Sequence, residues 1–344
     1  MGTSSSIVKS ADDGKQSTEL CDSCGKGEAN VCTECEKPVC DTCGPHKHNV
    51  MFEVKPVPLK NNKLKMNDVK HLKMIEAKCG VYTHSTELHV IGEAVYEDTK
   101  SREQSTQWGV YNLADDKTKP GIVTKRYPMD ERSLRFPGDT CSSVKFKHTY
   151  FTVPCKKMVF MYKKHSSFYE CFPTAGSCFG IACFAGGFAV SMEIKSNFNM
   201  PSAWQVQTFD EKGKLKKQFF YDSSGDALFK RPLFLDSNKS ETTLFVSDIG
   251  KRAIIALDVE GTKLFEFVNA ILNEPLGIAV DPEENIYVAC GSRVVQVEKG
   301  GVSFRELLPV GNHDKAVDIC FEPVENLLTV ILKSGAVTTV SLQK

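Results

Sequence analysis

The sequence has no run of 18 apolar residues, so it contains no candidate membrane-spanning helix. Its first twenty residues are polar and include no apolar signal-peptide core, so we expect no secretory signal and a cytoplasmic location. Neither charge is in excess, because 43 Lys and Arg residues balance 43 Asp and Glu residues. A globally basic nucleic-acid-binding protein is therefore excluded, and any affinity for nucleic acid or anionic lipid must be local.

Familiar catalytic motifs are also missing. The chain has no G-x-S-x-G nucleophile elbow, no H-E-x-x-H metalloprotease helix and no phosphate-binding loop. On this evidence the expectation is a protein that is not an enzyme. An N-terminal Met-Gly-Thr-Ser-Ser-Ser does fit the acceptor pattern for myristoylation at Gly2, which would give weak membrane attachment. The alternative for residues 1–18 is a plain disordered tail.

Cysteine, in contrast, is abundant, with 14 residues. Eight of them are scattered along the chain, and without a secretory signal most are expected to be reduced, buried side chains: Cys79, Cys141, Cys155, Cys171, Cys178, Cys183, Cys290 and Cys320. The other six form three C-x2-C pairs and are followed by two histidines: Cys21, Cys24, Cys32, Cys35, Cys40, Cys43, His46 and His48. Such pairs direct two thiolates to one ion, and eight ligands imply two tetrahedral zinc ions.

Few apolar residues surround this cluster, so metal binding must supply the free energy that folds residues 19–51. Because closed four-ligand sites leave no open coordination position, the predicted role of zinc is structural. The spacing resembles the B-box zinc finger of the tripartite-motif (TRIM) family. The resemblance implies one zinc held by Cys21, Cys24, Cys40 and Cys43, and a second held by Cys32, Cys35, His46 and His48. One residue separates the two histidines here, fewer than in most B-boxes, so His71 or a water is an alternative ligand.

A basic linker is predicted over residues 52–80, where seven lysines oppose three acidic residues. Asn67 or Asp68 could cap a short helix that runs to about Lys78. The segment has no sustained heptads, so the coiled coil typical of TRIM proteins is not expected, and a RING finger is also missing.

From residue 81 to 344 the pattern changes to short apolar strands separated by turn residues. The clearest unit predicts strands at 277–280, 286–289 and 293–298, with a turn over Asp281–Asn285. Phe184, Asp236, Asp281 and Glu322 align at spacings of about 40–50 residues, which is typical of β-propeller blades. These units resemble the NHL repeat. The predicted fold is therefore mostly β, with a B-box-type module followed by a six-bladed propeller, closed by a strand at about residues 81–90.

Three functions are compatible with this organisation. The TRIM-like resemblance implies a scaffold or adaptor that recognises protein partners through the B-box and propeller in ubiquitin-related regulation, with self-association through the B-box as a further expectation. The alternative is an RNA-binding regulator with a basic propeller face, where lysines alternate with aromatic side chains: Lys145, Lys147, Lys156, Lys157, Lys163 and Lys164.

The least favoured function is a calcium-dependent lactonase-like propeller enzyme. Its candidate carboxylates around a central channel are Asp236, Asp248, Asp281, Asp318 and Glu322. The competing interpretation is that these acids shape turns, which the Asp281-Pro282 pair favours.

Overall fold

The structure is a computed structural model. It describes residues 30–31, 38–39, 65–71, 74–83, 88–97, 104–113, 123–128, 138–143, 145, 148–162, 168–195, 202–309, 314–324, 326–334 and 336–342. The chain divides into two compact units, Met1–Glu53 and Val54–Lys344. Nearly all described elements are strands, which confirms the predicted mostly-β class. Within the described residues, no helix has the length and apolar character needed to cross a bilayer.

In the first unit, β1 (Asn30–Val31) pairs with β2 (Pro38–Val39) in an antiparallel ladder. The predicted zinc ligands (Cys21, Cys24, Cys32, Cys35, Cys40, Cys43, His46 and His48) all lie outside the described residues, and so does Gly2.

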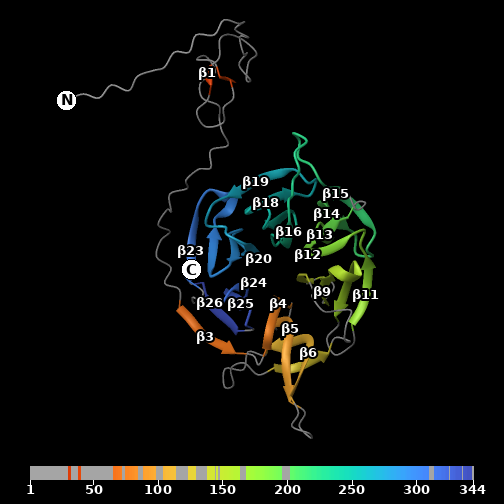
Figure 1. The fold of residues 1–344 in the computed structure, drawn as a ribbon, viewed down its shortest axis with the longest axis vertical. Coiled ribbons are helices and arrows are strands. Elements are labelled where there is room, and N and C mark those ends of the chain that lie inside the picture. Colours follow the sequence, from red (N-terminus) through yellow and green to blue (C-terminus); the bar gives the residue numbers. More distant parts are fainter. Residues whose placement is uncertain are drawn as a thin grey trace, which may run out of the picture. The chain divides into compact units, whose positions relative to one another are not determined.

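The second unit is a β-propeller whose four-stranded antiparallel sheets surround a central axis (Figure 1). Five sheets use strands that are consecutive in the chain. The first contains β4 (Met74–Tyr82), β5 (Leu88–Glu97), β6 (Gln104–Leu113) and β7 (Val123–Pro128). The second contains β8 (Thr140–Ser143), β9 (His148–Val153), β10 (Met158–Tyr162) and β11 (Phe168–Pro173). The third contains β12 (Ser177–Phe184), β13 (Gly187–Ile194), β14 (Ala203–Phe209) and β15 (Leu215–Phe219).

The fourth sheet contains β16 (Pro232–Ser237), β17 (Thr243–Asp248), β18 (Ala253–Asp258) and β19 (Lys263–Val268). The fifth contains β20 (Pro275–Val280), β21 (Ile286–Cys290), β22 (Arg293–Val297) and β23 (Phe304–Pro309). The last sheet joins β24 (Ala316–Glu322), β25 (Leu327–Leu332) and β26 (Ala336–Ser341) to an early strand, β3 (Lys65–His71). The inner strands β4, β8, β12, β16, β20 and β24 contact one another in that order, and β24 returns to β4.

Closure of the last sheet corrects two expectations. The strand that completes it is β3, which pairs antiparallel with β26 from Ser341↔Lys65 to Ala336↔His71. Within residues 81–90, predicted for this role, Val81 and Tyr82 belong to β4 and Leu88, His89 and Val90 to β5 of the first sheet. The helix predicted to run to about Lys78 is also wrong, because that segment forms β3 and β4. Local propensity is overridden here because pairing with β26 covers an edge that would otherwise expose unpaired backbone groups.

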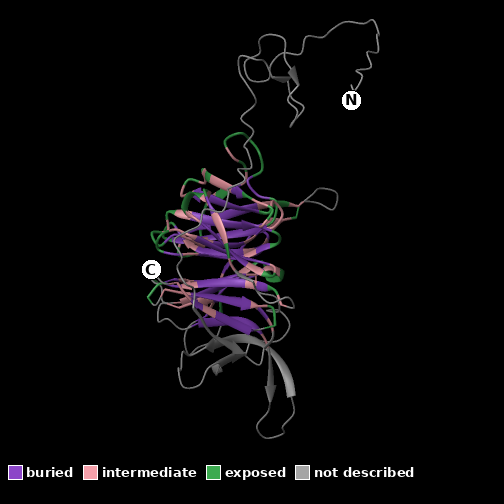
Figure 2. Ribbon diagram, turned by 90° about the vertical axis from the view of Figure 1, so that its left-hand side faces the viewer, coloured by how far each residue is buried: buried purple, intermediate pink, exposed green. Residues whose placement is uncertain are grey.

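The core lies between adjacent sheets, because each cluster of buried apolar side chains combines residues of two neighbouring sheets. Figure 2 shows many of the described strands as buried. In β18, Ile255 and Leu257 pack toward the third sheet, whereas Ile254 and Ala256 pack toward the fifth. This alternation is the period of two that a strand imposes on its side chains. It explains why β18 is apolar on both faces.

The predicted turn over Asp281–Asn285 is confirmed. Asp281 accepts hydrogen bonds from Asn285 N (2.8 Å, at Oδ1) and from Glu284 N (2.9 Å, at its carbonyl). In the turn after β18, Asp258 Oδ1 accepts from Glu260 N and Thr262 N. Gly261 adopts a φ of +86° there, a conformation that side-chain-bearing residues rarely adopt.

Candidate functional site

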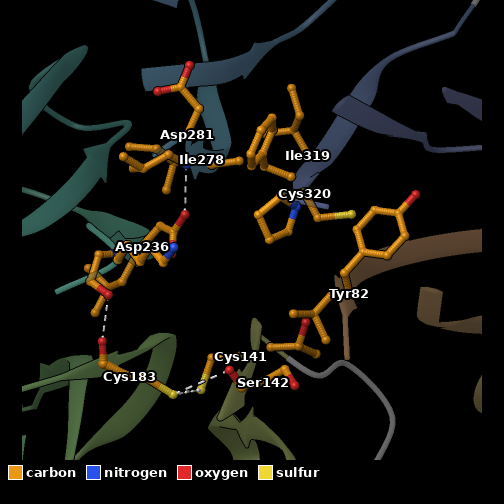
Figure 3. Close-up of a pocket in the computed structure, with 18 of the residues that line it drawn as sticks. Tyr82, Cys141, Ser142, Cys183, Asp236, Ile278, Asp281, Ile319 and Cys320 are labelled. Carbon is orange, nitrogen blue, oxygen red and sulfur yellow. Dashed lines mark hydrogen bonds between the residues drawn. The ribbon is translucent and has the colours of Figure 1, made fainter. Parts of the chain in front are cut away.

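A cavity of about 310 Å³ lies at the centre of the propeller, where the inner strands converge (Figure 3). Its wall includes residues of β4, β8, β12, β16, β20 and β24. Carboxyl, thiol and hydroxyl groups share this wall with apolar side chains. The polar and sulfur-bearing residues of the wall include Tyr82, Asp139, Cys141, Ser142, Cys183, Asp236, Ser237, Asp281, Asp318 and Cys320.

Asp236 connects two sheets at this wall. Its Oδ1 accepts a hydrogen bond from Ser237 N at 2.8 Å, and its Oδ2 accepts one from Val280 N of β20 at 2.9 Å. Removal of the carboxyl from water raises the pKa of Asp236 to about 7, because two backbone hydrogen bonds only partly offset the desolvation. Asp236 can therefore exchange a proton near neutral pH.

Asp318 makes the equivalent connection between the last and first sheets. Its Oδ1 accepts from Ile319 N and its Oδ2 from Gly80 N of β4, both at 2.8 Å. Desolvation raises the pKa of Asp318 to about 8. Gly277 of β20 leaves the room for this arrangement, because a Cβ there would meet Asp318 Oδ1 and Asp318 Cα.

Asp139 is a site residue that the sequence analysis missed. Its Oδ2 accepts from Ile181 N of β12 (3.1 Å) and Leu235 N of β16 (3.2 Å), so one carboxyl joins three sheets. Desolvation, followed by the nearby Asp318, raises the pKa of Asp139 well above its ordinary value. Asp-x-Cys occurs at Asp139–Cys141 and Asp318–Cys320, but also at Asp22–Cys24 and Asp41–Cys43, so this pattern alone does not identify Asp139.

Of the five carboxylates proposed from the sequence, Asp236, Asp281 and Asp318 line the cavity, whereas Asp248 and Glu322 are not part of its wall. Asp248 is fully buried and accepts backbone hydrogen bonds from Lys230, Arg231 and Lys251. Glu322 accepts from Val324 N at 3.0 Å. These two acids hold loops in place, as the competing interpretation of turn-forming acids predicted.

The carboxylates described do not fit a calcium site. Asp281 accepts from Asn285 N, Asn285 Nδ2 and Tyr287 Oη, and Asp236 and Asp318 each accept two backbone N–H groups. In the described part of the chain, no three His, Cys, Asp or Glu side chains are grouped closely enough to hold a metal ion. The described carboxylates therefore do not support a calcium-dependent reaction.

The basic stretch proposed for RNA is only partly described, because Lys147, Lys163 and Lys164 lie outside the described residues. Lys145 is paired with Glu211, and Lys156 and Lys157 are exposed at the turn η1 (Pro154–Lys156). The described aromatic side chains that alternate with these lysines are buried in the core: Tyr150, Phe151, Phe160 and Tyr162. The expected stacking surface is therefore wrong for these four aromatic side chains, because both faces of this sheet are covered: Tyr150 packs on one face and Phe151, Phe160 and Tyr162 pack on the other.

The scattered cysteines mostly behave as predicted. Cys79, Cys141, Cys178, Cys290 and Cys320 are buried, Cys171 and Cys183 are part-buried, and Cys155 is exposed. Burial raises the pKa of the Cys79 and Cys320 thiols well above the ordinary value, so both are neutral at physiological pH.

Comparison with known proteins supports the fold. No protein-family model matches the chain, and no curated protein matches it. Among solved structures, a putative gluconolactonase is similar with a TM-score of 0.57 at 15% identity, covering 82% of this chain and 93% of its own. A streptogramin B lyase has a TM-score of 0.54 at 10% identity, and the match covers 81% of this chain and 98% of the lyase chain.

A catalytically inactive virginiamycin B lyase from Staphylococcus aureus, solved with quinupristin, has a TM-score of 0.53 at 11% identity. The match covers 82% of this chain and 99% of the lyase chain. At such identities the likeness shows a common fold. It supports the β-propeller part of the sequence-based expectation, whereas the B-box and TRIM resemblance is not shown. The chain is thus similar in fold to lyase-like and lactonase-like propellers.

Proposed function

We propose that the propeller binds a small organic molecule in its central cavity. The observation that carries this proposal is the cavity itself, whose volume of about 310 Å³ is that of a small-ligand pocket. Its wall combines apolar side chains such as Ile278 and Ile319 with acceptor groups on Asp236 and Asp318. A ligand with an apolar ring and a few polar atoms would complement such a wall.

We further propose that the chemistry belongs to the lactonase or lyase class, which was the least favoured of the three sequence-based hypotheses. Two observations support this class. The similar propellers are named as lyases or as a putative gluconolactonase, and one of them was solved with quinupristin. Asp236, with a pKa of about 7, would act as the general acid–base, taking a proton from the ligand or from an attacking water.

The adaptor function remains a separate proposal that rests on the B-box resemblance of residues 19–51. It concerns protein partners, self-association and ubiquitin-related regulation. Nothing in the described part of the chain selects a particular partner. The two functions are compatible, because a zinc module and a ligand-binding propeller would use different units of the chain.

The experiment is a screen of cyclic esters and cyclic depsipeptides with the full chain, with ring opening followed by mass spectrometry and binding by thermal shift. We expect a compound that raises the melting temperature and is opened faster than in buffer. Asp236→Asn should lower the rate by at least about 100-fold, whereas Asp226→Asn, an exposed matched control, should not change it.

The two parts of the proposal fail separately in this screen. A compound that binds without ring opening would contradict the proposed lactonase or lyase reaction but would support the proposed ligand site. If no compound shifted the melting temperature, the ligand site itself would be wrong. Calcium and a chelator form a further arm, and neither is expected to change ligand affinity, because the described carboxylates do not fit a calcium site.

A further inference from the structure

Two thiols meet at the wall of the central cavity. Cys141 lies on β8 of the second sheet and Cys183 on β12 of the third, and their sulfur atoms are 3.8 Å apart (Figure 3). The Cys183 thiol also points to the carbonyl oxygen of Ser142 at 3.6 Å. The two residues are 42 positions apart in the sequence, so the propeller fold alone creates this pair.

We propose that Cys141 and Cys183 are a peroxide-sensitive dithiol that closes to a disulfide between β8 and β12. The sulfur atoms are already in contact, on strands that pack against each other in the inner ring. Bond formation would bring the two sulfur atoms from 3.8 Å to the S–S bond length of about 2.05 Å. The bond would tie two neighbouring sheets together at the wall of the proposed ligand cavity.

The two thiols differ in a way that assigns their roles. Both thiols line the cavity, but Cys183 is only part-buried, so its sulfur is the more accessible one to a small oxidant. Cys141 is buried, and desolvation together with its contact to Cys183 raises the pKa of its thiol well above the ordinary value. Cys183 is therefore the thiol that meets the oxidant, and Cys141 is the resolving thiol.

Hydrogen peroxide supplies the oxidising equivalents. The Cys183 thiol loses its proton, and the thiolate attacks one peroxide oxygen. The O–O bond breaks, and the departing hydroxide takes up that proton to form water, which leaves a sulfenic acid at Cys183. The Cys141 sulfur then attacks the Cys183 sulfur, and the S–O bond breaks. The departing hydroxide takes the Cys141 proton and leaves as water. Two thiols thus lose two electrons in total, and one peroxide becomes two waters.

The first test is peptide mapping of the full chain after exposure to excess peroxide, alkylation of the remaining thiols and digestion without reductant. Tandem mass spectrometry should identify a link between Cys141 and Cys183 that reductant removes. Free, fully alkylated Cys141 and Cys183 would overturn the proposal. A link from either one to Cys171, Cys178 or Cys320 would overturn it as well.

The second test uses thermal melting of the propeller. Oxidation should raise the midpoint of the wild-type protein by about 5 °C, because a cross-link restricts the unfolded chain. Cys141→Ser and Cys183→Ser should abolish this rise. Cys320→Ser is the matched control, because Cys320 lines the same cavity on β24 and should leave both the link and the rise intact. Equal rises in all four proteins would contradict the proposal.

Discussion

The carboxylate of Asp318 accepts a 2.8 Å hydrogen bond from the backbone N–H of Gly80, a residue 238 positions earlier in the chain. This bond joins β24 of the last sheet to β4 of the first sheet. A second bond, from Ile319 N to the other oxygen, holds the carboxyl in place. This buried side chain therefore contributes to closing the ring of sheets at its inner side, together with the packing of Ala77 and Val90 against Cys320 and Ile331 and with the β3–β26 ladder.

The first prediction concerns this closure. Asp318→Ala leaves the Gly80 and Ile319 N–H groups without their acceptor, which should lower the free energy of unfolding by about 2 kcal/mol. Urea unfolding at pH 5 measures this loss. At that pH the Asp318 carboxyl is neutral, so the substitution removes its hydrogen bonds without also removing a buried negative charge. Asp226→Ala, an exposed control, should change the free energy of unfolding by less than about 0.5 kcal/mol. Equal values for the two variants would show that the closure bond contributes nothing.

A second prediction is the pH dependence of stability. The folded-state pKa of Asp236 is about 7 against an ordinary value of 3.8, so the folded protein binds this proton more tightly than the unfolded chain. The free energy of unfolding should therefore fall as pH rises from about 4 to about 7, by up to about 4 kcal/mol for this group. The raised pKa values of Asp139 and Asp318 act in the same direction.

Urea unfolding at several pH values, for wild type and Asp236→Asn, checks this dependence. The variant should lose less stability over that interval than wild type, because an amide does not titrate. Asp226→Asn should follow the wild-type curve. Parallel curves for wild type and Asp236→Asn would contradict the raised pKa.

The third prediction concerns Gly277. A Cβ at this position would meet Asp318 Oδ1 and Asp318 Cα, and it would lie 2.8 Å from Ile319 N. Gly277→Ala should therefore separate β20 from β24 and cost about 3 kcal/mol or more of unfolding free energy, as overpacking does. Gly186→Ala is the control: its φ is +72° but a Cβ there has nothing within 4 Å, so only about 1 kcal/mol should be lost. Chemical denaturation of both variants measures the two losses of unfolding free energy. A larger loss for Gly277→Ala than for Gly186→Ala would show that steric overlap with Asp318, rather than backbone conformation, is the cause.

A fourth prediction concerns the cysteine-rich segment. We propose that residues 19–51 bind two zinc ions, so elemental analysis of the purified chain should find about two zinc per chain. Cys24→Ser or Cys43→Ser should lower this number. The melting transition of the propeller should stay unchanged, because Met1–Glu53 is a unit separate from Val54–Lys344. A propeller that melted earlier in these variants would show that the two units depend on each other.

The sequence by itself determined those features that depend on neighbouring residues. The strands at 277–280, 286–289 and 293–298 were predicted, and they correspond to β20, β21 and β22 within two residues at each end. The turn between the first two was also predicted, because an aspartate before a proline favours a turn, and Asp281 Oδ1 does accept a hydrogen bond from Asn285 N.

Tertiary structure decided everything that joins distant segments. Pairing with β26 makes Lys65–His71 a strand although its local sequence suggested a linker or a helix, because backbone pairing at a sheet edge leaves no periodic signal in the added strand. The partners of Asp139, Asp236 and Asp318 lie on other sheets, so no local pattern separates these carboxylates from turn-forming acids such as Asp248. The contact of Cys141 with Cys183 has the same origin, because packing of the second sheet against the third brings β8 against β12.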